Sequence, residues 1–257
     1  MRVFGLIGKS LSHSFSEKYF SGKFNKENIS DAEYRLFPLQ EMEELLPLIA
    51  TESELLGFNV TIPFKEKIIP FLDEIEENAR IIGAVNTVKI KIKNGKKFLC
   101  GYNTDAFGFK ESLKPLLRNN HRKALILGTG GASKAIEFVL KSLEIDCVFV
   151  SRQTEILKNK FPKKHFLAYD ELNENVMDAC QLIINTTPLG MFPNSDSYPE
   201  IPYKYITPNH LLYDLVYNPS ETFFLKQGNE KNALTQNGLI MLQIQAEKSW
   251  EIWNKGK

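Results

Sequence analysis

The sequence predicts an α/β protein built from two domains. Its 257 residues suit two modest domains, because single domains commonly contain about 100 to 200 residues. Short apolar strands alternate with helical segments along the chain, which is typical of sheets covered by helices. The polar run 118–123 interrupts this pattern. We therefore place a first domain at residues 1–105, completed by 236–257, and a second at residues 106–235.

The composition is that of an ordinary soluble globular protein. It is 43% hydrophobic and 25% charged, far from the disordered or membrane extremes. Thirty-two basic and 31 acidic residues leave a net charge of +1, so no global field attracts nucleic acid or an anionic membrane surface. The basic stretch 89–97 is typical of a solvated hairpin face. We expect a small-molecule substrate as the partner, with no nucleic acid and no membrane.

Cysteine and histidine usage predicts reduced thiols and no metal site. Cys100, Cys147 and Cys180 are widely spaced and form no C-x-x-C pair. The four histidines are also scattered without ligand spacing, and only His13 falls near the presumed site. Residues 1–11 lack the apolar run of a signal peptide, and no stretch of about 18 apolar residues occurs. We expect a cytoplasmic protein.

The first domain is predicted to open with a β-loop-α unit. An apolar strand at 2–7 runs into the Gly/Ser-rich loop 8–14, and a helix begins near Ser16. The elements that follow are a strand at 32–37, a helix at 40–49 with Leu45, Leu46 and Ile49 on its buried side, a strand at 57–60, and helices at 61–69 and 73–82.

A hairpin is predicted to close this domain. The dipeptide Asn94-Gly95 lies between the β-branched, alternating segments 87–92 and 97–102, which is a strong signal for a two-residue turn. A helix at 106–117 then bridges the two domains, and the polar run 118–123 follows it.

The second domain is predicted to be a doubly wound parallel sheet of the Rossmann type. A strand at 124–127, a glycine-rich turn, a helix at 132–143 and a strand at 147–150 follow in order. The apolar segments 181–185 and 211–216 continue the sheet. The amphipathic helix 238–253 ends the chain, and we expect it to return to the first domain.

The glycine-rich turn predicts a dinucleotide site. Gly128, Gly130 and Gly131 follow an apolar strand directly, and Ala132 continues into a helix. Glycines allow a tight turn and close backbone approach, while the helix N-terminus favours the negative charge of a pyrophosphate. Ser133 replaces the third glycine of the usual fingerprint, although the small Ala135 can pack on the sheet.

The end of the next strand favours NADP. Ser151-Arg152-Gln153 stands where an acidic residue normally contacts the ribose of NAD. Arg152 offers a planar cation that suits a 2′-phosphate. A surface position for Arg152 is the simpler structural interpretation, and the neighbouring Glu155 leaves NAD open.

Polar residues of the first domain follow the ends of its strands, where open α/β sheets bind ligands. Ser14 and Ser16 alone would indicate a helix N-cap. Lys65 alone would be a surface lysine, but it follows the apolar-flanked turn 59–64, which we expect to shield its amine from water and so to favour proton transfer. Asp105 follows a strand and does not lie on a charged helix.

These motifs resemble, in order and over nearly the whole chain, those of the shikimate dehydrogenase family. They are His13-Ser14-Phe15-Ser16, Asn59-Val60-Thr61-Ile62-Pro63-Phe64-Lys65, Gly83-Ala84-Val85-Asn86-Thr87, Gly101-Tyr102-Asn103-Thr104-Asp105, the glycine turn, and Met241-Leu242-Gln243-Ile244-Gln245-Ala246.

The resemblance implies a role for each matching residue. Lys65 and Asp105 would be the catalytic pair. Ser14, Ser16 and Tyr217 would hold the substrate carboxylate. The ring hydroxyls would be bound by Asn59, Thr61, Asn86, Asp105 and Gln245. The cofactor would be held by Gly128, Gly130, Gly131, Ala132, Ser151, Arg152, Thr186 and Gly238.

The implied activity is the NADP-dependent, reversible reduction of 3-dehydroshikimate to shikimate, in the pathway to chorismate and the aromatic amino acids. The implied assembly is a monomer or a homodimer. Ser151-Arg152-Gln153 departs from the Asn-Arg-Thr of many members, so the cofactor preference depends chiefly on Arg152.

Other functions remain open at this stage. A quinate/shikimate dehydrogenase using NAD or NADP would need only a small change in pocket shape. A tetrahydrofolate-linked dehydrogenase has a similar layout, but the serine pair suits a small carboxylate better than a pterin. A non-catalytic dinucleotide sensor would not need both Lys65 and Asp105.

Overall fold

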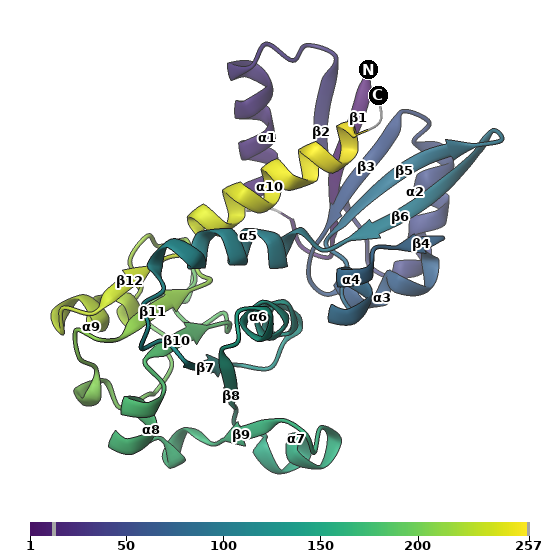
Figure 1. The fold of residues 1–257 in the computed structure, drawn as a ribbon. Helices are drawn as coiled ribbons and strands as arrows, with labels where there is room; N and C mark the ends of the chain where they lie inside the picture. The colour runs from purple at the N-terminus through teal and green to yellow at the C-terminus, as the bar shows by residue number, and fades with distance from the viewer. Residues whose placement is uncertain (12–13, 256–257) are drawn as a thin grey trace. The chain divides into compact units, whose positions relative to one another are not determined.

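The computed structural model describes residues 1–11 and 14–255, so His13 of the expected substrate motif lies outside the described residues. The chain forms two compact units, each with a sheet of its own (Figure 1). The first unit contains Met1–Phe107 and Gln243–Lys257, and the second contains Gly108–Leu242.

The first unit is built on a mixed six-stranded sheet in the order β2-β1-β3-β5-β6-β4. β1 pairs in parallel with β2 and β3, whereas β5 is antiparallel to both β3 and β6. The strands are β1 (Arg2–Gly8), β2 (Ala32–Pro38), β3 (Leu55–Val60), β4 (Glu74–Ile75), β5 (Thr87–Lys93) and β6 (Lys96–Tyr102).

Helices cover both faces of this sheet, because its strands carry apolar side chains on both sides. One core joins the sheet to the helices that follow β2 and β3, and another joins it to the first and last helices of the chain (Figure 1). The helical segments are α1 (Phe15–Lys26), the 3-10 turns Met42–Glu44 and Ile69–Phe71, α2 (Leu45–Thr51), α3 (Phe64–Lys67), α4 (Glu77–Ile82) and α10 (Leu239–Asn254).

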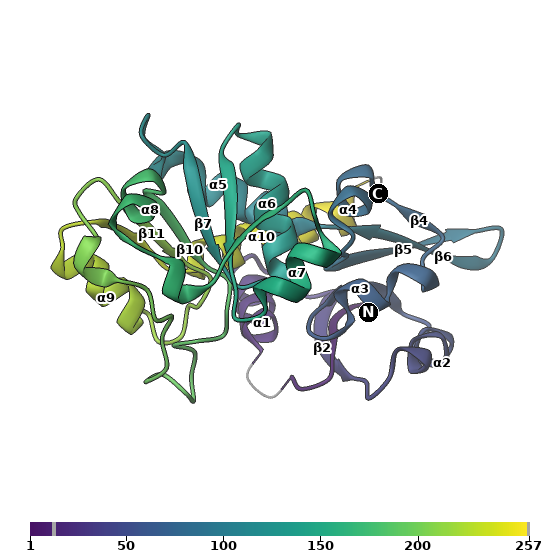
Figure 2. The same ribbon diagram turned by 90° about the horizontal axis from the view of Figure 1, so that it is seen from below.

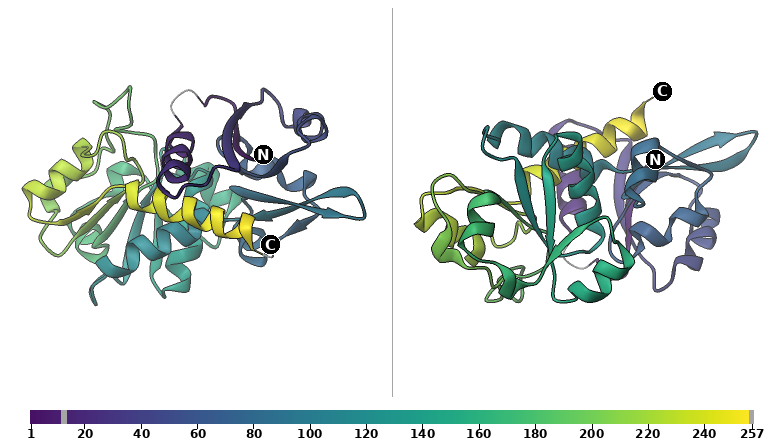
Figure 3. Two further views of the ribbon diagram at one scale, coloured as in Figure 1. Left: turned by 90° about the horizontal axis from the view of Figure 1, so that it is seen from above. Right: turned by 60° about the horizontal axis from the view of Figure 1, so that its bottom comes forward.

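The predicted hairpin is present and extends beyond the rest of its sheet (Figure 3). Asn94 and Gly95 both have positive φ, of 53° and 75°. Two consecutive positive φ angles match the twist of the flanking strands, which explains why this dipeptide makes the turn.

The second unit is an all-parallel, six-stranded sheet (Figure 2). Its order β9-β8-β7-β10-β11-β12 is the 3-2-1-4-5-6 order of a doubly wound dinucleotide-binding fold, and the predicted fold class is confirmed. The strands are β7 (Lys123–Leu127), β8 (Asp146–Val150), β9 (His165–Leu167), β10 (Leu182–Asn185), β11 (Leu211–Asp214) and β12 (Leu234–Gln236).

Helices also cover this second sheet. α8 and α9 contribute to one core, and α5 packs on the sheet through Phe109, whose ring forms a T-shaped pair with that of Tyr213, with centroids 5.1 Å apart. The helices are α5 (Thr104–Leu113), α6 (Gly131–Ser142), α7 (Thr154–Lys160), α8 (Glu174–Ala179) and α9 (Phe223–Glu230), with 3-10 turns at Lys114–Leu116, Tyr169–Glu171 and Tyr203–Tyr205.

Three local predictions were wrong. Leu46 is 54% exposed, because the segment begins with a 3-10 turn that changes which side chains face the core. The helix expected at 61–69 is shortened to the four residues of α3. The segment 73–82 starts with the short strand β4 before α4 begins.

Candidate active site

The lysine and the carboxylate predicted to act together are in direct contact. Lys65 Nζ lies 2.7 Å from Asp105 Oδ2, and their side chains are 21% and 12% exposed. Lys65 is held in place because its helix neighbours Phe64 and Ile68 are fully buried. Asp105 lies in the first turn of α5, immediately after β6. An amine and a carboxylate distant in the chain thus share one partly buried location.

Asn86 orients the second oxygen of this carboxylate. The backbone N–H of Thr104 donates to Asn86 Oδ1 at 2.6 Å. Because an N–H can only donate, this bond fixes the orientation of the amide. Asn86 Nδ2 therefore faces Asp105 and donates to its Oδ1 at 2.9 Å. Asp105 receives Lys65 on one oxygen and Asn86 on the other.

Asn59 and Gln245 join the same buried network. Tyr34 donates its hydroxyl to Asn59 Oδ1 at 2.8 Å, and Asn59 Nδ2 donates to the Asn86 carbonyl at 3.2 Å. Gln245 comes from α10 and accepts from Asn86 Nδ2 at 3.4 Å. The exposed fractions of Asn59, Asn86 and Gln245 are only 4%, 3% and 5%.

The serine pair divides its roles. Ser14 is the N-cap of α1 and accepts from the Glu17 N–H at 3.5 Å, which is the cap expected of such a residue. Burial raises the pKa of the Tyr34 phenol, and its interaction with Ser16 opposes that rise. Ser16 is thereby linked to Asn59 through one tyrosine.

Thr61 lies directly after β3 and packs closely on β1. Its backbone N–H donates to the Ile7 carbonyl at 2.9 Å. A Cβ added to Gly8 would come within 2.5 Å of Thr61 Cγ2, so glycine makes room for this threonine.

The glycine turn of the second unit opens a groove. Gly128 has φ +102°, which favours glycine, and an added Cβ would lie 2.8 Å from Thr187. At Gly130, in contrast, an added Cβ would meet nothing within 4 Å, so there is open space above the start of α6. The N-terminus of α6 has no side-chain cap. Open space beside uncapped N–H groups fits a pyrophosphate.

A cavity of about 840 Å³ in the second unit collects most of the predicted cofactor residues. It is lined by Gly128, Gly130, Ser151, Arg152 and Thr186. Gly131 and Ala132 instead form the first turn of α6. Ser133 is buried and donates to the Gly130 carbonyl at 2.7 Å, which tightens the turn.

The charges of this groove differ from those expected. Glu155, the carboxylate that left NAD open, is 87% exposed and pairs with Lys158 at 3.6 Å. The carboxylates that line the cavity are Asp196 and Glu200, from the loop after β10. Arg152 is the basic residue of the lining.

A buried carboxylate supports the wall of the groove. Asp214 ends β11 and is fully buried; burial raises its pKa to about 6, and hydrogen bonds from Thr222, Val216 and Asn185 oppose the rise. Asn185 donates to Asp214 Oδ1 at 2.9 Å and accepts from the Thr187 hydroxyl at 2.6 Å. Asp214 thus holds the segment that carries Thr186 and Thr187.

Tyr217 and Gly238 lie elsewhere in the second unit. Tyr217 follows β11 and is partly buried, which raises the pKa of its phenol. A Cβ added to Gly238 would come within 2.2 Å of the Leu215 carbonyl oxygen, so only glycine allows this backbone approach.

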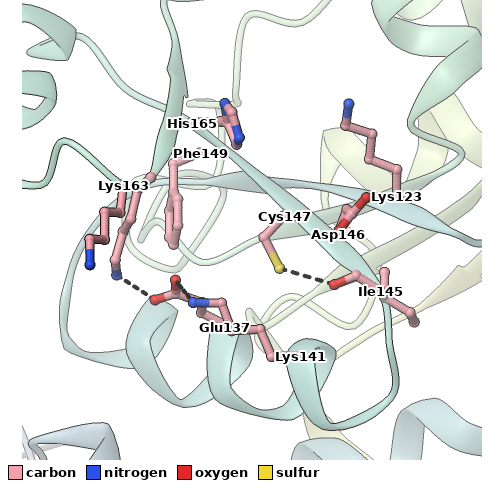
Figure 4. A pocket seen from close by; sticks show the side chains of 10 residues that line it. Lys123, Glu137, Lys141, Ile145, Asp146, Cys147, Phe149, Lys163 and His165 are labelled. Atoms are coloured by element: carbon pink, nitrogen blue, oxygen red, sulfur yellow. Dashed lines mark hydrogen bonds and ion pairs between the residues drawn. The ribbon is translucent and has the colours of Figure 1, made fainter.

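A smaller cavity of about 210 Å³ in the second unit contains an ion-pair cluster (Figure 4). Glu137 of α6 is nearly buried, and its two oxygens accept from Lys141 and Lys164. Both oxygens of this one carboxylate are thus paired with a lysine. Within residues 1–11 and 14–255, no group of three or more His, Cys, Asp or Glu side chains is arranged to hold a metal ion. No helix of that same part is long and apolar enough to cross a membrane.

A doubly wound unit with an open glycine turn, together with an α/β unit that carries a lysine–aspartate pair, defines a two-domain dehydrogenase of the dinucleotide-binding class. The family model for the shikimate dehydrogenase substrate binding domain matches residues 6–88. The chain belongs to the shikimate dehydrogenase family, as its motifs indicated.

Similar proteins cover the chain throughout. Shikimate dehydrogenase (NADP(+)) of Methanococcus maripaludis strain C6 is 39% identical over 100% of this chain and 92% of its own length. The enzyme of the same name from Caldicellulosiruptor saccharolyticus is 38% identical over 98% of this chain and 92% of its own.

Solved structures show the same fold. A shikimate dehydrogenase in complex with NADP+ superimposes with a TM-score of 0.84 at 35% identity, covering 99% of this chain and 90% of that one. The Thermus thermophilus enzyme in complex with NADP(H) and shikimate gives 0.83 at 28% identity, covering 99% and 94%.

Reasoning from the sequence missed several residues of the network. Tyr34, Thr87, Thr104 and Ser249 each hydrogen-bond to a predicted site residue. Thr87 and Thr104 adjoin Asn86 and Asp105 in the motifs, and that adjacency was the available signal.

Proposed function

We propose that this chain catalyses the reversible reduction of 3-dehydroshikimate to shikimate with NADPH, and that it works in the cytoplasm on the route to chorismate. The single observation that carries the proposal is the contact of 2.7 Å between Lys65 Nζ and Asp105 Oδ2. It occurs in a chain whose relatives are named shikimate dehydrogenase (NADP(+)). The substrate is a small molecule, and the assembly is a monomer or a homodimer.

The chemistry needs a proton carrier at the alcohol oxygen. Oxidation of a secondary alcohol removes the hydroxyl proton while a hydride leaves the same carbon, so a base must lie within hydrogen-bond reach of that oxygen. Lys65 would accept the proton, and in the reverse direction its ammonium would return it to the carbonyl oxygen. Asp105 would hold the amine and accept a hydrogen bond from the substrate hydroxyl. When bound, NADP accepts the hydride and NADPH supplies it.

The remaining polar residues of the first unit would orient the substrate. Asn59, Asn86 and Gln245 carry amides that bind hydroxyl groups well, and Thr61 adds a hydroxyl at the end of β3. Ser14 and Ser16, at the start of α1, would receive the carboxylate, because a helix N-terminus favours negative charge. Tyr217 of the second unit would add a phenol donor.

The groove of the second unit would hold the cofactor. The turn at Gly128 and Gly130 leaves room for the pyrophosphate, and the guanidinium of Arg152 would offer two N–H donors to the 2′-phosphate. Ser151 and Thr186 would supply hydroxyls, Gly131 and Ala132 the N–H groups at the start of α6, and Gly238 a close backbone approach.

One assay tests the proposal. Purified protein is mixed with shikimate and NADP, and absorbance of the reduced nicotinamide is followed, with quinate and NAD as comparison arms. We expect turnover of shikimate with NADP. Equal rates on quinate would identify the broader quinate/shikimate enzyme. Binding of NADP without turnover of either acid would identify a dinucleotide sensor.

A further inference from the structure

Three buried hydroxyl groups meet beside the proposed catalytic pair. Thr87 Oγ1 lies 2.8 Å from Ser249 Oγ and 3.0 Å from Thr104 Oγ1. Thr104 Oγ1 and Ser249 Oγ are 3.2 Å apart, which closes the triangle. The three residues are 0%, 1% and 0% exposed, so none of them is available to touch a substrate.

Each hydroxyl comes from a segment that also carries a proposed site residue. Thr87 follows Asn86 at the start of β5, and Thr104 precedes Asp105 at the start of α5. Ser249 lies one turn after Gln245 on α10. The triangle is therefore the point at which three distant segments of the active site are tied together.

The directions of the bonds can be worked out. Ser249 donates to the Gln245 carbonyl at 2.9 Å, and this uses its single hydrogen. Ser249 must then accept from Thr87, and it also accepts from Asn59 Nδ2 at 2.9 Å. Thr87 Oγ1 lies 3.0 Å from the same Asn59 Nδ2, whose two hydrogens are shared among Thr87, Ser249 and the Asn86 carbonyl. A directed chain runs from Asn59 through Thr87 and Ser249 to α10.

Thr104 connects these hydrogen bonds to the carboxylate of Asp105 through Asn86. Its backbone N–H fixes the Asn86 amide, and its hydroxyl accepts from Asn86 Nδ2 at 3.0 Å. That same nitrogen donates to Asp105 Oδ1 at 2.9 Å. A rotation of Asn86 would remove one of the two bonds that orient Asp105 against Lys65.

We propose that the hydroxyl triangle of Thr87, Thr104 and Ser249 positions the Asn86–Asp105–Lys65 chain for proton transfer. The proposal rests on the proposed dehydrogenase function. These three are positioning residues, because they act through Asn86 and Asp105. Packing alone does not require them, since apolar side chains of the same shape fill a core without needing partners.

Two substitutions of one residue separate positioning from packing. Thr87→Val keeps the shape and removes the hydroxyl, whereas Thr87→Ser keeps the hydroxyl and removes a methyl group. We expect kcat with shikimate to fall about tenfold in Thr87→Val, a factor that corresponds to about 1.4 kcal/mol in the barrier. Thr87→Ser should stay within about twofold of the wild type. KM for NADP should not change in either variant.

A second variant keeps the test decisive if Thr87→Val folds poorly. Ser249→Ala removes the α10 hydroxyl with a residue that favours helix, and it should also lower kcat about tenfold. The matched control is Ser112→Ala, which deletes another buried helical hydroxyl, bonded to the Gly108 carbonyl at 2.8 Å and to Tyr213 at 2.7 Å. Its kcat should not change.

The outcomes are distinct. The positioning role would be overturned if Thr87→Ser lost as much kcat as Thr87→Val. It would also be overturned if either Thr87→Val or Ser249→Ala kept the wild-type kcat. Failure of the wild type to oxidise shikimate with NADP would instead overturn the proposed function.

Discussion

At the scale of the residue, the site depends on how the two carboxylate oxygens of Asp105 are bonded. Asp105 gives one oxygen to Lys65 and the other to Asn86, which leaves the amine and the carboxylate fixed relative to each other. Fixed geometry is what general acid–base catalysis requires, because the proton donor must stay within hydrogen-bond reach of the reacting oxygen.

Lys65→Ala tests the acid–base role directly. We expect turnover to fall by about 10²- to 10⁴-fold, the usual contribution of a positioned proton carrier, with shikimate binding largely kept. Calorimetric titration measures the binding, and reduced-nicotinamide absorbance measures the turnover. The control is Lys67→Ala, an exposed lysine on the same short helix, which should keep full activity. Unchanged turnover in Lys65→Ala would refute the assignment.

At the scale of the element, α10 completes the core of the first unit. Trp253 is 2% exposed, stacks on Phe4 with ring centroids 4.8 Å apart, and donates its indole N–H to the Val88 carbonyl at 2.9 Å. Gly57 of β3 makes this possible, because an added Cβ would lie 2.4 Å from the indole ring.

Gly57→Ala should destabilise the protein by about 1 to 3 kcal/mol, because overpacking forces Trp253 or the strand to move. The paired control is Gly22→Ala in α1, where an added Cβ meets nothing within 4 Å. Alanine there should stabilise the helix by about 0.5 to 1 kcal/mol. Urea unfolding curves measure both. Equal stability of the two variants would contradict the packing argument.

The ion-pair cluster of α6 ties that helix to the start of β9 (Figure 4). Burial acts against ionisation of Glu137, yet the hydrogen bonds from Lys141 and Lys164 prevail and lower the pKa of its carboxyl below 4.5. A carboxyl whose folded pKa is depressed stabilises the fold above its unfolded pKa. The contribution is lost as the pH falls through the folded pKa.

Glu137→Gln should therefore cost about 1 kcal/mol of stability near neutral pH, since it removes one charge from hydrogen bonds that remain partly solvated. The difference from the wild type should shrink as the pH drops below about 4.5. Denaturant unfolding at several pH values measures it. A difference independent of pH down to the acid limit would rule out the ionic origin.

At the scale of the whole molecule, two units with separate cores divide the work. The first unit is discontinuous in sequence, because the chain returns to it at Gln243 after completing the second. The proposed acid–base pair lies in the first unit, and the groove proposed for the cofactor lies in the second. A ligand that binds the folded second unit must then stabilise that unit.

NADP should raise the melting temperature in a concentration-dependent way. At one hundred times its Kd it should add about 2.7 kcal/mol to the free energy of unfolding. Arg152→Gln should lose much of this effect for NADP and keep the effect of NAD, because only NADP carries the 2′-phosphate. Thermal melts with each cofactor measure both. Equal losses for NADP and NAD would show that Arg152 does not distinguish them.

The local sequence pattern was sufficient to predict much of the fold and the family of this protein. The strand-turn-helix at Gly128, the Asn94-Gly95 hairpin and the parallel second sheet follow from periodicity and glycine placement, which act over a few residues. The family followed from motifs such as the one that ends in Lys65. The error at Leu46 arose where a 3-10 turn altered the periodicity, and the error at 73–82 arose where a short strand precedes the helix.

Only the tertiary structure decided which polar side chains meet. Tyr34, Thr87 and Ser249 are separated by up to 215 residues in a chain of 257, yet they share hydrogen bonds with Asn59. Sequence spacing predicts which face of an element a residue occupies, but it carries no information on what the opposite element presents. The sequence did not predict the buried carboxylate of Asp214 or the position of Asp196 and Glu200 in the lining of the groove, for the same reason. Burial and partners arise only when distant strands and helices pack together.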